Sequence, residues 1–198
     1  MVTDMISAIA AIAAIAATIL PLGFLVVLFG GGALFLRNKI EQDGEAPINR
    51  TLFYISKYSI LVLWGAMVLQ IWGISISLFK VPSFLQVTGL VLWFFGFALL
   101  YIGRFEMGSS FRLGTPKEHT NLKVNGLFRL SRNPMYVGMY ATMAASGLYT
   151  LNPVVISLAV FVIAIHHSIV LAEENQMQKV FGQEYLEYRN RVGRYILV

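Results

Sequence analysis

Long apolar runs separated by clusters of charge form the main pattern of this sequence. With histidine counted as neutral, runs without a charged residue cover residues 5–36, 58–79, 81–103 and 133–172, and they are 32, 22, 23 and 40 residues long. A helix needs about 20 residues to cross a hydrocarbon core about 30 Å thick. The first three runs therefore predict one membrane-spanning helix each, and the fourth run is long enough for two.

The fourth run contains Asn152-Pro153 near its middle. Proline removes a backbone donor and disfavours helix in the residue before it. We therefore predict a tight helical hairpin made of residues 135–150 and 153–172. The first arm has 16 residues, which would reach only about 24 Å as a straight helix. We expect it to begin or end below the membrane interface, covered by the rest of the protein.

Beyond the fifth predicted span, apolar residues recur at spacings of three or four. This spacing is typical of an amphipathic helix, which we expect to lie at the membrane interface, with Gly182 as a weak point or bend. The residues of the apolar stripe are Met177, Val180, Phe181, Tyr185, Tyr188 and Val192.

These elements together predict an all-α, polytopic membrane protein with five transmembrane helices, the last two forming the hairpin, and a C-terminal amphipathic interfacial helix. In this interpretation residues 1–198 form a single membrane domain. The composition agrees, since 57% of the residues are hydrophobic and only 13% are charged.

The first apolar run differs from a cleaved signal peptide. It lacks a basic start, carries Asp4 and is about twice as long as the apolar part of a signal peptide. We therefore expect a retained helix.

The basic residues are distributed very unequally over the two sides of this topology. Fourteen of the fifteen lysines and arginines fall on one side, and Lys80 alone falls on the other. Basic residues concentrate on the cytosolic side of multi-pass integral membrane proteins. The N-terminus is therefore predicted outside and the C-terminus in the cytosol. The net charge of +5 requires no nucleic-acid partner, because basic residues that flank apolar spans account for it.

The largest polar segment on the cytosolic side, residues 108–132, leads directly into the fourth span. Its glycines and Pro116 favour turns, and Asn133-Pro134 can cap and start the next helix. A helix N-terminus offers unpaired N–H groups that suit a carboxylate. The segment is either a ligand-binding loop or a plain connection between spans.

Because the chain has no cysteine, thiolate metal sites and cysteine nucleophiles are excluded, and no metal site is predicted.

Two adjacent acids, Glu173 and Glu174, stand where the fifth span is predicted to leave the membrane. Acids at a helix C-terminus oppose the helix dipole, so a cationic partner is expected. Arg104, Arg112 and Arg132 are candidates for this partner, and so is the ammonium group of a ligand.

His166 and His167 precede these acids by one to two helical turns. An ionisable residue at that depth in a membrane is a functional hypothesis by default, although only one of two adjacent side chains can face a given site. The alternative is a packing role. An alternative function is that of a small transporter or structural membrane protein. In such a protein the two histidines and Glu173-Glu174 would form a path for protons or ions. This alternative predicts a pH-dependent flux in liposomes that contain the protein.

Four short stretches in the second half of the chain form a specific combined pattern. They are GLF at residues 126–128, RNPMYVG at 132–138, EE at 173–174 and FGQEYLEY at 181–188. In order and spacing they resemble the isoprenylcysteine carboxyl methyltransferase and phospholipid methyltransferase group of membrane enzymes, over about residues 108–194. The resemblance implies an S-adenosylmethionine-dependent methyltransferase that acts on a lipophilic substrate, with residues 104–198 as its cofactor-binding and catalytic part.

The resemblance also implies which residues serve the reaction. An aromatic such as Phe128 or Tyr136 would stack on the adenine, Glu173 or Glu174 would pair with the cofactor ammonium, and backbone N–H groups would hold its carboxylate. The full set of expected cofactor contacts is Lys117, His119, Thr120, Asn121, Leu122, Lys123, Phe128, Asn133, Pro134, Met135, Tyr136, Glu173 and Glu174. The expected catalytic residues are Arg132, His166 and His167.

The sequence departs from the family pattern at three positions. Asn133 replaces a histidine and Phe128 replaces a tyrosine, changes that leave the fold and the cofactor site intact. Ile169 stands where isoprenylcysteine enzymes carry an arginine that holds the substrate carboxylate. Arg104, Arg132 or a protonated histidine would have to hold that carboxylate instead. Prenylcysteine carboxyl methylation is the best-matched chemistry, and the alternative is an amine or thiol methyltransferase acting on a phospholipid or small lipophilic molecule.

Overall fold

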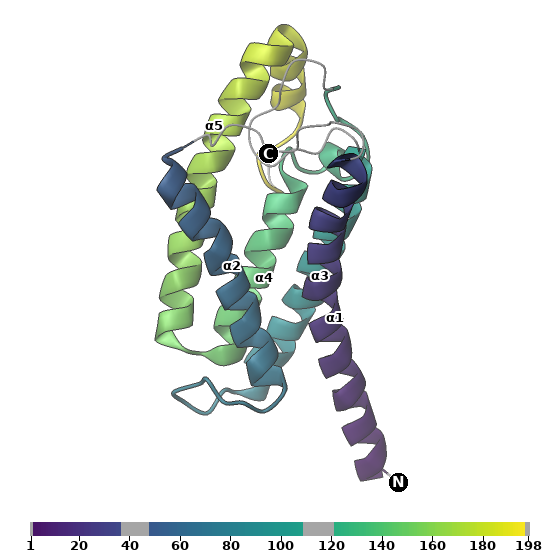
Figure 1. Cartoon of the computed structure of the whole chain (residues 1–198), viewed down its shortest axis with the longest axis vertical. Helices are drawn as coiled ribbons and strands as arrows, with labels where there is room; N and C mark the ends of the chain where they lie inside the picture. Colours follow the sequence, from purple (N-terminus) through teal and green to yellow (C-terminus); the bar gives the residue numbers. More distant parts are fainter. Residues whose placement is uncertain (1, 37–47, 109–120, 197–198) are drawn as a thin grey trace.

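The structure, a computed structural model, describes residues 2–36, 48–108 and 121–196, and within these residues every regular element is a helix (Figure 1). The prediction of an all-α protein is confirmed for this part of the chain. The N-terminal end of α1 and the bend at the far end of α5 lie at opposite ends of the bundle (Figure 1). The elements are α1 (Val2–Leu36), α2 (Arg50–Ile71), α3 (Ser83–Met107), the short 3-10 helix η2 (Gly126–Arg129), α4 (Pro134–Thr150) and α5 (Pro153–Arg191).

Four of the described helices are long and apolar enough to cross a membrane. They are the segment Ala10–Leu28 of α1, together with α2, α3 and α5. α4 has 17 residues and is therefore only about 26 Å long. It lies among α2, α3 and α5 in the bundle (Figure 1), which agrees with the expectation that this arm is covered by the rest of the protein.

The ends of α2 differ from the predicted span, residues 58–79. The helix begins at Arg50, because the Asn49 side chain accepts two backbone N–H groups of the first turn. It ends at Ile71, and the Gln70 side chain accepts the N–H of Ile76 at 2.7 Å in the loop that follows. The uncharged run therefore locates the apolar span, whereas polar caps set the ends of the helix.

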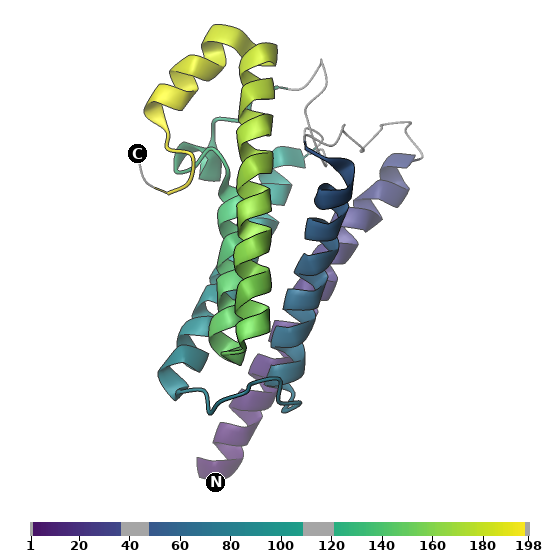
Figure 2. The same ribbon diagram turned by 90° about the vertical axis from the view of Figure 1, so that its left-hand side faces the viewer.

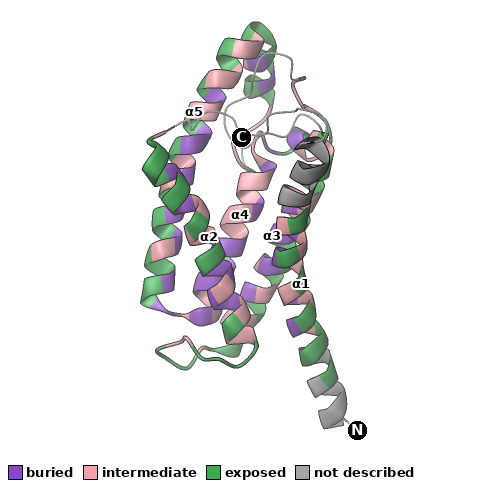
Figure 3. Ribbon diagram, viewed as in Figure 1, coloured by how far each residue is buried: buried purple, intermediate pink, exposed green. Residues whose placement is uncertain are grey.

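Aromatic side chains join α1, α2 and α3 in the core. Phe24, Trp64, Trp93 and Phe97 are buried, and neighbouring ring centroids among them lie 4.9 to 6.5 Å apart. Trp93 also donates its indole N–H to the carbonyl of Ala17 at 3.1 Å. Exposed residues lie on the outward faces of the helices (Figure 3), and many of them are large hydrophobic residues. This arrangement suits a bundle surrounded by lipid.

Glycines allow α3 and α4 to approach each other closely. Gly89, Gly96 and Gly103 recur every seven residues on the face of α3 that meets α4. A Cβ atom on Gly96 would lie 2.6 Å from the carbonyl oxygen of Gly138, and one on Gly103 would lie 2.6 Å from the side chain of Met135. Small residues commonly permit such contact between membrane helices. The first turn of α4 is thereby held firmly against the end of α3.

Gly96→Ala is expected to destabilise the protein by about 1–3 kcal/mol, because the added methyl group collides with the backbone of α4. Gly65→Ala is the matched control, since nothing lies within 4 Å of a Cβ atom at that position. Thermal denaturation in detergent should give a lower Tm for Gly96→Ala and an unchanged or slightly higher Tm for Gly65→Ala. Equal Tm values would contradict the close packing of α3 on α4.

α5 begins at Pro153 as predicted, but the helix does not end at residue 172, where the predicted hairpin arm ends. The helix continues to Gly182, which has φ 53° and ψ −122°, and a shorter helical stretch then folds back beside the bundle (Figure 2). The predicted bend at Gly182 is confirmed. Glu173 and Glu174 consequently lie inside a helix, so the argument from acids at a helix C-terminus does not apply to them.

Candidate functional site

Three segments that are distant in sequence meet at the end of the bundle where α5 bends. They are the loop from η2 into α4, the part of α5 around Glu174, and residues 192–195 after α5. The backbone N–H of Arg132 donates to the carbonyl of Gly193 at 2.9 Å, and the Ser131 hydroxyl donates to the carbonyl of Arg194 at 3.2 Å. The return of the chain at Gly182 therefore brings the C-terminal segment back onto the start of α4.

η2 is positioned by Glu106 at the end of α3. The backbone N–H of Leu127 donates to the Glu106 carboxylate at 2.9 Å, and Gly126 has φ 61° beside that carboxylate. A Cβ atom on Gly126 would collide with Glu106. The loop consequently enters the site in one defined conformation. It places Phe128 in a buried position, where its carbonyl accepts the Tyr188 hydroxyl at 2.6 Å.

Glu174 is the centre of a buried ionic cluster. Its carboxylate accepts the Arg132 guanidinium in bidentate fashion at 3.1 to 3.2 Å, the Asn133 amide at 2.9 Å and the Arg194 Nε at 3.0 Å. The side chains of Arg132 and Glu174 are only 7% and 9% exposed. Arg132 also donates Nη1 to the carbonyls of Val192 and Arg189, at 2.7 and 3.1 Å. These donors belong to the start of α4 and to the C-terminal segment, so the Glu174 carboxylate joins both segments to α5.

Among the predicted candidates that the structure describes, Arg132 is therefore the cationic partner of Glu174. Arg194, which the sequence analysis missed, is a second partner of Glu174. Arg104 lies at the end of α3 and donates Nη1 to the Gly108 carbonyl at 3.2 Å. Arg112 lies outside the described residues. Only the fold could have indicated Arg194, because its partner is 20 residues away across the bend.

Glu173 has different surroundings from its neighbour. Its two carboxylate oxygens accept the Tyr136 hydroxyl, each at 3.1 Å, and the Tyr136 ring lies 6.1 Å from the ring of His166. His166 donates its Nδ1–H to the Val162 carbonyl at 2.9 Å, because a carbonyl oxygen can only accept. The Nε2 of His166 is then the nitrogen that carries a lone pair. Glu173, Tyr136 and His166 form a second polar group, which we call the Glu173 corner.

His167 lies apart from this corner. Its Nδ1 is hydrogen-bonded to the Tyr195 hydroxyl at 2.7 Å, and the Tyr195 ring packs 5.6 Å from the ring of Tyr140. Burial raises the pKa of Tyr195, so this phenol is neutral at physiological pH. The two adjacent histidines thus divide between the Glu173 corner and the C-terminal segment, as their spacing on a helix requires.

The remaining predicted cofactor contacts lie in the loop before η2 and in the first turn of α4. Leu122 and Lys123 are half-buried and Asn121 is exposed. Pro134 is the first residue of α4, and the Met135 side chain packs at Gly103. Lys117, His119 and Thr120 lie outside the described residues.

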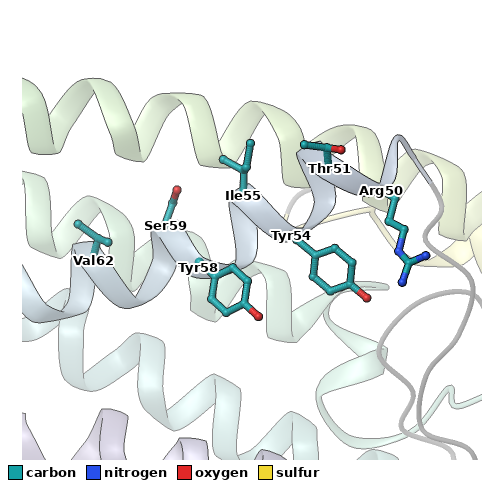
Figure 4. Close-up of a pocket in the computed structure, with 7 residues that line it drawn as sticks. All are labelled: Arg50, Thr51, Tyr54, Ile55, Tyr58, Ser59 and Val62. Carbon is teal, nitrogen blue, oxygen red and sulfur yellow. The ribbon is translucent and has the colours of Figure 1, made fainter.

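A shallow hollow lies elsewhere, on the outer face of α2 (Figure 4). All of its lining residues come from that one helix. The hollow is separate from the ionic cluster and the Glu173 corner. Its lining residues are Arg50, Thr51, Tyr54, Ile55, Tyr58, Ser59 and Val62.

Apolar helices that meet in a polar, ion-paired site at one end define an integral membrane protein with its candidate site near one surface. A sequence model of the phospholipid methyltransferase family matches residues 84–184, which are 101 of the 198 residues. The chain belongs to this family, and the resemblance found in the sequence is confirmed.

Curated relatives with the name protein-S-isoprenylcysteine O-methyltransferase are similar to this chain. The protein of Homo sapiens is 32% identical over 117 residues, a match that covers 57% of this chain and 41% of that protein. The protein of Saccharomyces cerevisiae is 31% identical over 111 residues, or 54% of this chain and 46% of that protein. The matches thus span less than half the length of these relatives.

Proposed function

We propose that this protein is an S-adenosylmethionine-dependent methyltransferase that acts on a lipophilic acceptor, with prenylcysteine carboxyl O-methylation as its best-matched reaction. The observation that carries the proposal is the Glu173 corner. In it, Glu173 and Tyr136, from two of the family-like stretches, are hydrogen-bonded at the polar end of an apolar bundle. Membership of the phospholipid methyltransferase family and the names of the relatives support the same reaction class.

The described residues fit the cofactor chemically. An amino-acid ammonium needs a carboxylate, and Glu173 supplies one that is not enclosed by arginines. The rings of Phe128 and Tyr136 suit adenine, and the first turn of α4 suits the cofactor carboxylate. Residues 121–123, Asn133, Pro134 and Met135 would line the same space, together with Lys117, His119 and Thr120. Glu174 is instead assigned to holding the ionic cluster.

When bound, the cofactor supplies a methyl group on a sulfonium, a leaving group that needs no protonation. The protein therefore chiefly has to align the acceptor with the methyl group and exclude water. Arg132 is unavailable to the acceptor, because Glu174 and two carbonyls occupy its guanidinium. His166 would accept a proton through Nε2 if the acceptor were an amine or thiol, whereas a carboxylate acceptor needs no base. His167, bonded to Tyr195, would support the C-terminal segment.

The site would face the cytosol if the basic residues set the orientation. In the proposed topology α4 crosses the membrane as a fifth span inside the shell of the other helices. The N-terminus would then be outside, and the helical stretch after Gly182 would lie at the cytosolic interface in contact with membrane lipids. We propose no nucleic-acid partner.

Purified protein in detergent is expected to bind S-adenosylhomocysteine with micromolar-range affinity in calorimetry. Methyl transfer from labelled S-adenosylmethionine should occur to S-farnesyl-N-acetylcysteine, and phosphatidylethanolamine should be a poor acceptor in the parallel assay. The reverse preference would favour the amine reading, in which His166 acts as the base. No detectable heat with correctly folded protein would remove the cofactor proposal altogether.

A further inference from the structure

The hollow on the outer face of α2 runs along the helix from a polar end to an apolar end. Arg50 and Thr51 lie where α2 begins, and Val62 lies at the other end of the hollow. Val62 is twelve residues after Arg50, or about 18 Å further along the helix axis. One leaflet contributes about half of a hydrocarbon core about 30 Å thick. Because α2 is one of the candidate spans, the hollow extends from the membrane surface through about the depth of one leaflet.

Two rows of side chains flank the hollow (Figure 4). Arg50, Tyr54 and Tyr58 extend to one side of α2, whereas Thr51 and Ile55 extend to the other side. The guanidinium carbon of Arg50 lies 5.8 Å from the centroid of the Tyr54 ring, a cation–π contact that keeps the cation beside the hollow. The hollow is therefore cationic where α2 begins, aromatic in its middle part and apolar further along.

The two tyrosines of the hollow are exposed to the membrane. Tyr54 is 41% exposed and Tyr58 is 65% exposed, and the hydroxyl ends of both rings point toward the Arg50 end of α2 (Figure 4). A phenol hydroxyl in contact with hydrocarbon chains lacks a hydrogen-bond partner, which costs free energy. Tyrosine is accordingly common at the level of lipid headgroups, where the ring contacts apolar chains and the hydroxyl finds a polar group. The ester groups of a phospholipid would be such partners.

The charge around the hollow is positive. Arg50 is exposed, and none of the described lining residues is acidic. Lys57 stands next to the hollow without lining it, with its Nζ 4.1 Å from the centroid of the Phe53 ring and 6.0 Å from that of the Tyr54 ring. A guanidinium forms strong charge-assisted hydrogen bonds with a phosphate. A headgroup with a net negative charge fits this end better than a zwitterionic headgroup, whose own cation Arg50 would repel.

We propose that the outer hollow of α2 is a binding site for one anionic phospholipid. Arg50 and the Thr51 hydroxyl hold the phosphate, and the hydroxyls of Tyr54 and Tyr58 donate to the ester groups. One acyl chain lies along Ile55 toward the middle of the membrane. The site is separate from the Glu173 corner, so the inference goes beyond the proposed methyl transfer and does not depend on it.

The test counts the lipids bound to the full-length protein in detergent by native mass spectrometry. The probes are dioleoyl phosphatidylglycerol, which is anionic, and dioleoyl phosphatidylcholine, which is zwitterionic with the same acyl chains. The wild-type protein is expected to bind one phosphatidylglycerol at least about fivefold more tightly than phosphatidylcholine, the effect of one basic residue near a membrane surface. Inorganic phosphate at millimolar concentration should not displace the lipid, because it has no acyl chain to occupy the apolar part of the hollow.

Variants of the hollow separate the headgroup contact from the other contacts. Arg50→Gln should remove the preference for phosphatidylglycerol, and Arg50→Lys should keep most of it. The double variant Tyr54→Phe/Tyr58→Phe should weaken the binding of both lipids by a similar factor, about threefold, and leave the preference intact. Arg129→Gln is the matched control, since it removes an exposed arginine of η2 outside the hollow, and it should bind both lipids as the wild type does.

Four results would overturn the inference. The first is equal affinity of the wild-type protein for the two lipids, and the second is an Arg50→Gln variant that keeps the preference at an unchanged Tm. The third is an equal loss of preference in Arg50→Gln and Arg129→Gln, which would reveal a general effect of surface charge. The fourth is displacement of phosphatidylglycerol by inorganic phosphate, which would assign the hollow to a free anion.

Discussion

Glu173→Gln is expected to weaken the binding of S-adenosylhomocysteine on the order of 100-fold and to abolish measurable methyl transfer. The substitution keeps the size of the side chain but removes the negative charge that the proposed function assigns to the cofactor ammonium. A buried ammonium without its counter-ion loses far more than one hydrogen bond. Calorimetry and a labelled-methyl assay on protein with an unchanged Tm would measure both effects.

Two further variants separate the charge of Glu173 from its hydrogen bond. Tyr136→Phe removes the hydroxyl that donates to Glu173 at 3.1 Å and keeps the ring, so a loss of at most about tenfold is expected. Glu184→Gln removes an exposed acid of the same helix and should change nothing. Equal losses for Tyr136→Phe and Glu173→Gln would show that Glu173 only positions Tyr136 and does not bind the ammonium.

Local chain chemistry made much of the fold predictable from the sequence. The turn at Asn152-Pro153 is one example, because proline and an amide cap act on adjacent residues. The Asn152 side chain accepts the N–H of Val154 at 2.9 Å, and Leu151 before it has φ 45°. The start of α5 therefore follows from Asn152 and Pro153 alone. The bend at Gly182 is another local feature, since glycine adopts its positive φ without a steric cost.

Contacts across the fold explain what the sequence analysis missed. The end of α5 could not be predicted from the length of the uncharged run. Glu174 and Arg132 neutralise each other in the ionic cluster, so the helix continues through charged residues. Arg194 and Tyr195 stand in an unremarkable basic tail. They acquire partners in Glu174 and His167 only after the chain reverses.

Arg132→Met is expected to destabilise the protein by about 3–5 kcal/mol and to release the C-terminal segment. Its guanidinium neutralises Glu174 and also satisfies the carbonyls of Val192 and Arg189, so its removal leaves a buried carboxylate short of charge. Arg132→Lys should recover little, because an ammonium cannot reproduce the bidentate geometry. Thermal denaturation in detergent and limited proteolysis after Gly182 would measure the two effects.

The double variant Arg132→Met/Glu174→Met identifies the cause of that loss. If the penalty comes from the unpaired carboxylate, removing both charges should restore part of the Tm, because paired ions replaced together by apolar groups cost little. Arg129→Met is the matched control, since it removes an exposed arginine only three residues away. A similar Tm for Arg132→Met and Arg129→Met would contradict the ionic cluster as the element that joins the start of α4, α5 and the C-terminal segment.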